Sequence, residues 1–193
     1  MGKITIFGQA GTGTTSVGEN LAKALGYKFL SSGNLFRSKA EELGIEFYKF
    51  EKFCQRNPKY DLEIDKTIAT FGKKNNSFVV ESRLAYHFIP DSLKIKLTCD
   101  YITRIRRVAG RDGIAFSAAS EKTNFREDVA KKRYRKLYGI KDFGSDKKFD
   151  LIADTSRKSA EEIAAMIISK FKLPFPFHPL GLFVSVAKRE TSR

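Results

Sequence analysis

The segment from residue 8 to residue 15 combines glycines and hydroxyl side chains at a spacing that suits phosphate chemistry. It reads GQAGTGTT and lies between a short apolar run and a helix-like pattern. Glycines allow successive backbone N–H groups to turn toward one anion, and the N-terminus of the following helix adds further free N–H groups. The skeleton G-x-x-x-x-G-x-[ST] therefore predicts a loop that binds a nucleotide phosphate, with the hydroxyl of Thr15 as a ligand of Mg²⁺.

This loop departs from the usual motif at Thr14, where lysine normally supplies a cation to the β- and γ-phosphates. A glycine-rich turn without a ligand is the alternative, but the strand-like run before the loop and Thr15 after it favour phosphate binding. The residues that we expect to contact the phosphate donor are Gly8, Gln9, Ala10, Gly11, Thr12, Gly13, Thr14, Thr15 and Ser16.

Arginines recur at helical spacing in two later segments. Arg104, Arg107 and Arg111 are three and four residues apart, so one helix places them on one face. Arg126 and Arg133 are seven apart and likewise point the same way. Phosphoryl transfer needs cations where negative charge gathers, and arginine grips phosphate oxygens bidentately. The alternative for such a set is an ordinary solvated basic surface.

A carboxylate and an arginine end the apolar run SFVVESR at residues 77–83. Glu81 at the end of a buried strand is difficult to explain as a surface residue, and we interpret it as an outer-shell partner of Mg²⁺. The alternative is a buried structural ion pair between Glu81 and Arg83.

Composition bounds the class of protein. The chain of 193 residues suits one domain, and its net charge of +14 attracts polyanions without choosing among them. Cys54 and Cys99, with His87 and His178, form no zinc-type spacing. Because no apolar stretch approaches the roughly 20 residues of a membrane span and no secretory signal is visible, we expect a cytoplasmic protein without a membrane partner.

Strand-like and helix-like patterns alternate along the chain. Strands are predicted at residues 3–7, 27–30, 77–82, 93–99 and 149–153. Helices are predicted at residues 15–25, 32–42, 47–55, 62–71, 101–111, 124–138 and 159–170, with Ser32 and Asp100 as N-caps and residues 112–123 irregular. This alternation predicts a parallel sheet with helices on both faces.

Further motifs, in chain order, resemble those of one family. They are SSGNLFR at residues 31–37, VVESRL at 79–84, the arginine series from 104 to 111, RE at 126, RY at 133, YGI at 138 and DLIADTS at 150–156. With GTGTTS they make residues 3 to about 170 similar to the archaeal-type cytidylate kinases, which are P-loop nucleoside monophosphate kinases. The resemblance implies a three-layer α/β/α fold with a five-stranded parallel sheet in the order 2-3-1-4-5.

The resemblance also implies how the donor nucleotide binds. ATP with Mg²⁺ would lie over the glycine-rich loop, with Arg104 or Arg107 beside the adenine. Arg111, Arg126 and Arg133 would close on the phosphates. No general base is required, because positioning and electrostatic stabilisation dominate this chemistry.

For the acceptor, the resemblance implies CMP or dCMP. Arg37 and Arg83 would hold its phosphate, with Ser32 and Asn34 near the base or the helix start. Asn34 departs from the aspartate of the family motif, and its amide offers a donor as well as an acceptor, so the selectivity for the base stays open. Ser32 could equally be a simple helix cap.

The predicted organisation is one kinase domain at residues 1–172, with monophosphate-binding helices at about 32–73 and a lid at about 112–125 that closes to exclude water. Residues 173–193 form a C-terminal tail of unknown role. We expect a monomer whose partners are small nucleotides. Two alternatives are a kinase-fold protein that binds nucleic acid with weak or no catalysis, and a kinase for another small acceptor. The basic helix carries no RNA-binding signature, which disfavours nucleic acid.

Overall fold

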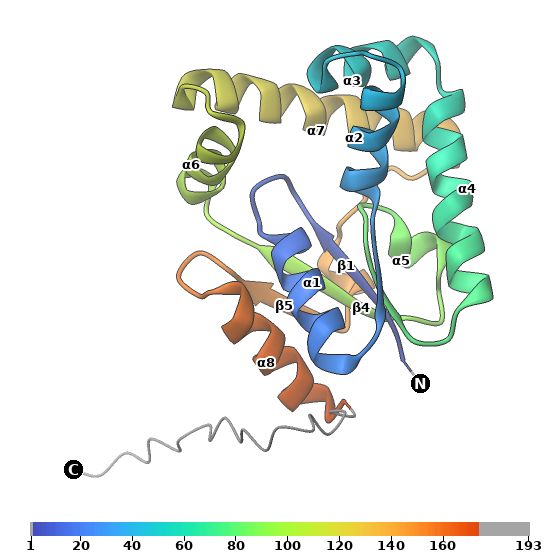
Figure 1. Ribbon diagram of the computed structural model, residues 1–193, viewed down its shortest axis with the longest axis vertical. Helices are drawn as coiled ribbons and strands as arrows, with labels where there is room; N and C mark the ends of the chain where they lie inside the picture. Colours follow the sequence, from blue (N-terminus) through green and yellow to red (C-terminus); the bar gives the residue numbers. More distant parts are fainter. Residues whose placement is uncertain (1, 174–193) are drawn as a thin grey trace.

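Five parallel strands form one sheet in the computed structural model, which describes residues 2–173 (Figure 1). The order across the sheet is β2-β3-β1-β4-β5, so β1 is central and β2 and β5 are the edges. The strands are β1 (Lys3–Gly8), β2 (Lys28–Ser31), β3 (Phe78–Glu81), β4 (Leu93–Thr98) and β5 (Leu151–Asp154). The predicted fold class and strand order are confirmed.

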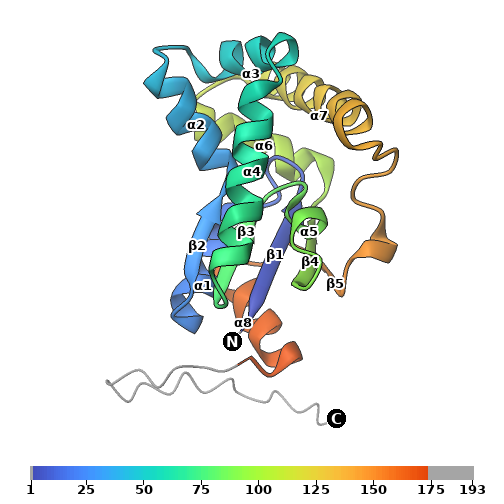
Figure 2. The ribbon, with the colours of Figure 1, turned by 90° about the vertical axis from the view of Figure 1, so that its right-hand side faces the viewer.

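Helices cover both faces of this sheet (Figure 2). α1 (Thr14–Leu25) and α8 (Ala160–Phe171) pack on one face, and α4 (Lys59–Lys74) and α5 (Ala85–Phe88) pack on the other. Leu173, the last described residue, still packs against the core beside α8. The rest of the predicted tail lies outside the described residues.

Residues of the central strand alternate between the two faces, as a strand requires. Ile4 and Ile6 are fully buried among side chains of α1 and α8, whereas Phe7 packs with Leu84 and Tyr86 on the opposite face. The core therefore fixes β1 from both sides, and the loop that leaves its carboxyl end starts from a rigid position.

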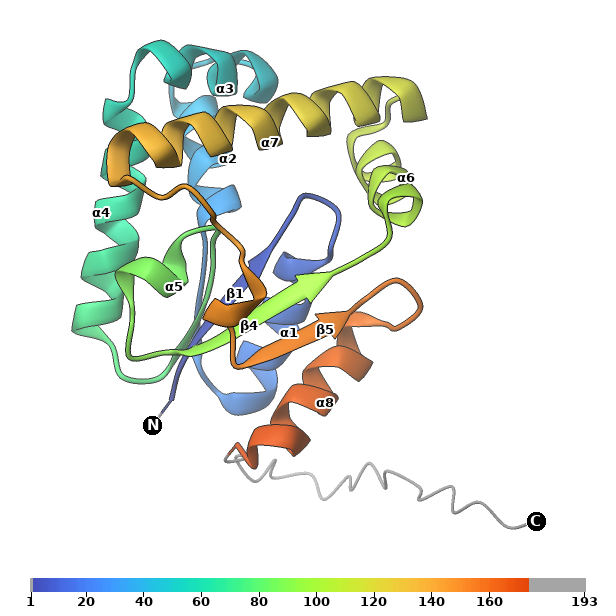
Figure 3. The ribbon, with the colours of Figure 1, turned by 180° about the vertical axis from the view of Figure 1, so that it is seen from behind.

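Four helices lie beyond the carboxyl ends of the strands (Figure 1). They are α2 (Ser32–Glu42), α3 (Phe47–Arg56), α6 (Tyr101–Asp112) and α7 (Phe116–Tyr138). Figure 3 shows that α7 spans the molecule from α6 at one end to α4 at the other. A short 3₁₀ turn at Asp146–Lys148 precedes β5. Among residues 2–173, none of the helices combines the length and apolarity that a membrane crossing requires.

The prediction that residues 112–123 are irregular is wrong. Gly113, with φ of 63°, ends α6, and α7 already begins at Phe116, so residues 113–115 alone separate the two helices. Alanine, glutamate and lysine at 118–122 are strong helix formers, and Ala119 packs with Ile105 and Val108 of α6. Propensity and packing together extend the helix into the segment assigned to the lid.

The cap of α2 is also displaced by one residue. Ser31 is the N-cap, and its hydroxyl accepts a hydrogen bond of 3.2 Å from the backbone N–H of Asn34. Ser32, the predicted cap, is the first helical residue. Two adjacent serines can both cap, so the strand that ends at Ser31 decides between them.

Candidate active site

The glycine-rich loop is held in shape by left-handed glycines and by contact with α6. Gly11 and Gly13 have φ of 84° and 83°, and Gly13 is the N-cap of α1. A Cβ added at Gly11 would lie 2.4 Å from the backbone carbonyl oxygen of Arg104. Glycine at residue 11 is therefore required both by the backbone conformation and by the close approach of the neighbouring helix.

Replacing Gly11 with alanine is expected to lower the free energy of unfolding by about 1–3 kcal/mol, because it adds backbone strain and a clash with a carbonyl group. Urea unfolding measures the loss. Gly110→Ala is the matched control. An added Cβ there meets nothing within 4 Å in an exposed part of α6, so stability should rise by about 0.5–1 kcal/mol. Equal stability of the two variants would contradict this account of the loop.

Arg104 supports the loop from behind. Arg104 is 5% exposed, and its Nε donates to the carbonyl oxygen of Ala10 at 3.0 Å. Its two terminal nitrogens donate to the side chains of Gln9 and Glu127. It does not line the cavity described below, so the structure does not bring Arg104 together with the other predicted site residues. The sequence spacing placed it on the correct helix face, but the same face also packs against the loop.

Arg107, one helical turn further along α6, contacts the segment after β5. Its Nη2 donates to the carbonyl oxygen of Thr155 at 2.7 Å and its Nη1 to the Thr155 hydroxyl at 3.1 Å. Thr155 in turn donates to the carbonyl oxygen of Thr12 at 2.8 Å. Arg107 thus joins the segment after β5 to the glycine-rich loop, and it lines the cavity.

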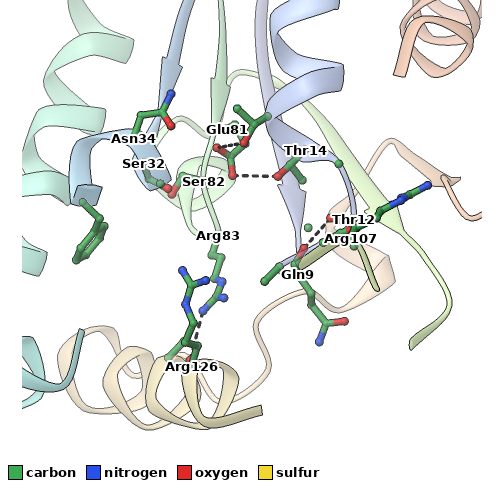
Figure 4. Close-up of a pocket in the computed structure, with 18 of the residues that line it drawn as sticks. Gln9, Thr12, Thr14, Ser32, Asn34, Glu81, Ser82, Arg83, Arg107 and Arg126 are labelled. Atoms are coloured by element: carbon green, nitrogen blue, oxygen red, sulfur yellow. Dashed lines mark hydrogen bonds between the residues drawn. The ribbon is translucent and has the colours of Figure 1, made fainter. Parts of the chain in front are cut away.

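Glu81 lies among three hydroxyl groups at the carboxyl end of β3. Thr14 Oγ1 donates to Glu81 Oε1 at 3.1 Å (Figure 4). Ser31 Oγ donates to Glu81 Oε2 at 2.5 Å. Thr15 Oγ1 lies 3.4 Å from the same Oε2. The ion pair between Glu81 and Arg83 that we considered as an alternative is absent from the contacts of the described residues. Figure 4 shows Arg83 extending away from Glu81 toward Arg126.

This arrangement fits a Mg²⁺ site. Mg²⁺ prefers oxygen ligands and is usually held by one or two carboxylates together with substrate phosphates. Thr15 and Glu81 provide a hydroxyl and a carboxylate side by side, next to a loop with free N–H groups. Thr14, which replaces the lysine of the motif, is 8% exposed and directs its hydroxyl to the same carboxylate.

Two arginines of the site lie together on the opposite side. Arg83 Nη1 is 3.5 Å from the backbone carbonyl oxygen of Arg126. Arg126 Nε is 2.5 Å from Glu51 Oε1 of α3. Burial lowers the pKa of Arg126, and Glu51 opposes this shift. Since arginine stays protonated even so, Glu51 is the counter-ion of a charge that faces the cavity.

The remaining predicted arginines have different partners. Arg111 pairs with its neighbour Asp112 at 2.7 Å and is partly exposed. Arg37 Nη1 donates to Asn34 Oδ1 at 3.3 Å. Arg133 Nη1 lies 2.6 Å from Asp61 Oδ1, so a carboxylate of α4 already balances its charge.

One cavity of about 750 Å³ contains almost the whole predicted site. Every predicted residue lines it except Arg104. The lining residues that sequence reasoning missed include Lys158, Glu51, Cys54 and Asp65. Lys158 could have been found, because it follows the carboxyl end of a strand, where ligands of parallel sheets bind. The other three lie on helices whose orientation depends on tertiary packing.

Solved structures share this architecture. Shikimate kinase from Acinetobacter baumannii, in complex with shikimate, has a TM-score of 0.60 at 16% identity, and the match covers 89% of this chain and 93% of that chain. An uncharacterised protein from Eubacterium ventriosum has a TM-score of 0.62 at 18% identity, with 90% and 100% covered. This chain has the fold of P-loop kinases, with a five-stranded parallel sheet and a glycine-rich loop at the start of α1.

Sequence comparison gives the family. The model of the cytidylate kinase-like family matches residues 3–157, and the chain belongs to this family. Cytidylate kinase from Pyrococcus abyssi is 39% identical over 165 residues, which are 85% of this chain and 90% of that protein. Cytidylate kinase from Methanobrevibacter smithii is 34% identical over 170 residues, which are 88% of this chain and 98% of that protein.

Proposed function

We propose that this protein is a kinase that transfers the γ-phosphoryl group of ATP to CMP or dCMP. The observation that carries the proposal is a single cavity that joins the phosphate loop to separate arginines from α2, α7 and the segment after β3. A donor and an acceptor phosphate can therefore meet in one place. The relatives named cytidylate kinase support a cytidine monophosphate as the acceptor.

The donor side consists of the loop at residues 8–16 and Arg107. Backbone N–H groups of the loop bind phosphate oxygens, and the N-terminus of α1 favours their negative charge. Thr15 and Glu81 would hold Mg²⁺, which, when bound, neutralises charge on the β- and γ-phosphates. Position 14 is threonine and not the lysine of the motif, so Arg111 and Arg126 supply the positive charge that this lysine would provide.

The acceptor side consists of Arg37 and Arg83, which bind the phosphate of CMP. Asn34 orients Arg37 through its side-chain oxygen. With the phosphates aligned, transfer needs positioning and charge stabilisation, and no side chain has to act as a general base. We also propose that the enzyme works as a monomer on nucleotides of the cytoplasm.

The connection between α6 and α7 serves as the lid. The segment proposed for this role, about residues 112–125, contains the three-residue turn at 113–115 and the first turns of α7. Because α7 also carries Arg126, a movement of the lid shifts a cation toward the phosphates and excludes water from the transfer.

An ADP-release assay with ATP, Mg²⁺ and a panel of nucleoside monophosphates tests the function. CMP or dCMP should give the highest turnover, and UMP, AMP and GMP should give less. A reaction without acceptor measures the ATPase background. Equal rates for all acceptors, or none above that background, would overturn the assignment of the acceptor.

A further inference from the structure

A small group of charged residues separates the main cavity from a smaller one of about 260 Å³. The smaller cavity lies where α3 approaches α6 and α7, since most of its lining residues come from these helices. The residues that line both cavities are Arg37, Glu51, Arg111 and Arg126. Long side chains with open space on two sides lack the close packing that fixes rotamers in a core. These three arginines therefore need other contacts to hold them in one orientation.

Arg126 receives such contacts from α3, which lies beside α7 (Figure 3). Glu51 Oε1 lies 2.5 Å from Arg126 Nε, and the guanidinium carbon of Arg126 lies 5.1 Å from the centre of the Phe47 ring. Phe47 and Glu51 are one turn apart on α3, so they lie on one face of that helix. The ring limits where the guanidinium lies, and the hydrogen bond at Nε limits how it turns. We refer to Phe47 and Glu51 as the Arg126 support.

The hydrogen bond at Nε leaves the terminal nitrogens of Arg126 available. Within residues 2–173, Nη1 and Nη2 of Arg126 donate no hydrogen bond, and neither is a fully buried donor without a partner. Arg126 lines the main cavity. Two parallel N–H donors of a guanidinium bind a phosphate bidentately. The Arg126 support thus uses the one donor of the side chain that such a phosphate contact does not need.

Phe47 contacts a second arginine of the site in the same way. The guanidinium carbon of Arg37 lies 5.3 Å from the centre of the Phe47 ring. Arginine is attracted to the face of an aromatic ring. One ring of α3 therefore contacts both Arg37, which we assign to the acceptor phosphate, and Arg126, which we assign to the donor phosphates. The position of α3 helps to set the distance between these two cations.

The carboxylate of Glu51 is unfavourable for phosphate binding as such. A negative charge in the wall of a cavity that binds phosphates repels them. Glu51 Oε2 is also buried without a hydrogen-bond partner among the described residues. Burial lowers the pKa of Arg126, Glu51 raises it, and the nearby charges of Arg83 and Arg111 lower it further. What a carboxylate provides here, and a neutral side chain does not, is a charge-assisted and directional bond to the guanidinium.

We propose that Glu51 is a positioning residue for phosphoryl transfer, which together with Phe47 orients Arg126 so that Nη1 and Nη2 meet the transferred phosphoryl group. The proposal rests on the kinase function proposed above. Groups that stabilise developing charge are effective when they are held in place before the reaction. A residue of the acceptor-side helices would thus control a cation that acts on the donor phosphates.

The experiment measures kcat and both KM values in Glu51→Ala. Loss of the support should lower kcat by roughly tenfold to a hundredfold, because a displacement of about 1 Å at a catalytic group can cost this much. KM for ATP and for CMP should stay the same or fall, since the variant removes a negative charge from the cavity. Electrostatic repulsion alone predicts the opposite change in kcat, so the sign of the effect separates positioning from repulsion.

Three further variants test the route of the effect. Glu51→Gln keeps an oxygen that can accept from Arg126 Nε, so it should retain more of kcat than Glu51→Ala. Phe47→Leu keeps an apolar side chain without the aromatic face and should lower kcat by a smaller factor than Glu51→Ala. Glu121→Ala removes an exposed acid from α7 and controls for the change in net charge; both kinetic constants should stay unchanged.

A double-mutant cycle shows whether Glu51 acts through Arg126. In the Arg126→Ala background, Glu51→Ala should cause little further loss of kcat, because the side chain that Glu51 orients is gone. An equal loss with and without Arg126 would overturn the proposal. Thermal unfolding checks that each variant is folded, and if Glu51→Ala is not folded, Glu51→Gln takes its place in the cycle.

The outcomes separate this proposal from the function on which it depends. Turnover of CMP by the wild type tests the kinase assignment. If the wild type is active and Arg126→Ala is impaired, but neither Glu51 variant loses kcat, the function stands and the positioning role is overturned. A Glu51→Gln variant that is faster than the wild type would show that the carboxylate competes with phosphate, which overturns it as well. A fully active Arg126→Ala would remove the roles of both residues and leave the kinase function in place.

Discussion

Arg126→Ala is expected to lower kcat by roughly a hundred- to a thousandfold, which corresponds to about 3–4 kcal/mol of transition-state stabilisation. The reason is the residue at position 14. Thr14 offers a hydroxyl that is already directed to Glu81, so the β- and γ-phosphates receive no cation from the loop. Arg126 faces the same cavity, and because it is buried, its charge interacts more strongly with a phosphate than it would in water. Initial rates at saturating ATP and CMP measure the loss.

A double-mutant cycle with Thr14→Lys tests whether the two positions act on the same phosphates. Thr14→Lys alone should change the rate little, whereas in the Arg126→Ala background it should restore part of the lost activity. Arg135→Ala, an exposed arginine of the same helix, is the control and should have no effect. Additive effects would show that position 14 and Arg126 act separately, and a fully active Arg126→Ala would refute the compensation.

Arg83→Ala is expected to lower kcat/KM for CMP by about a hundredfold or more, because it removes a charge-assisted contact with the acceptor phosphate. Arg37→Ala should have an effect of the same size. KM for ATP should change much less in both variants, since the donor phosphates bind to the loop and not to these arginines. Steady-state kinetics with each nucleotide varied in turn provide the measurement.

Arg106→Ala serves as the control for these two variants, because Arg106 is an exposed arginine of α6. It should leave both kinetic constants unchanged. Equal losses of affinity for ATP and CMP in Arg83→Ala would place that arginine elsewhere or indicate a damaged fold, and thermal unfolding of the variant separates these two explanations.

Much of this site could be predicted because its chemistry is encoded in local patterns. The loop from Gly8 to Thr15 needs only its own spacing and a strand before it, and the structure places it as expected. Glu81 could be singled out because a carboxylate rarely ends an apolar strand without a reason, and the structure places it in the cavity among hydroxyl groups. The strand order came from the family resemblance, since local patterns alone do not fix which strands are neighbours.

The errors occurred where one pattern permits two environments. The face of α6 that carries Arg104 and Arg107 was predicted correctly, but helical spacing cannot say that Arg104 lies under the loop while Arg107 borders the cavity. That difference depends on how closely Gly11 approaches α6. Asp65 and Glu51 were missed because, in a sequence, acids on amphipathic helices look like solvated surface. Only packing of α3 and α4 against α7 turns these acids inward.

The long helix α7 also limits how this chain can vary in length. Three residues of this one helix contact three different partners: Glu127 contacts Arg104, Arg133 contacts Asp61, and Tyr138 contacts Asp65. Because the helix is continuous, the angles between these three side chains are fixed. Each helical residue turns the chain by about 100°. A single inserted residue between Glu127 and Arg133 would therefore rotate every contact with α4 away from its partner, although no side chain had been changed. The turn at residues 113–115 precedes all these contacts, so an insertion there leaves their mutual register intact. In this part of the protein, the short turn is therefore the place where these contacts would tolerate a change of chain length.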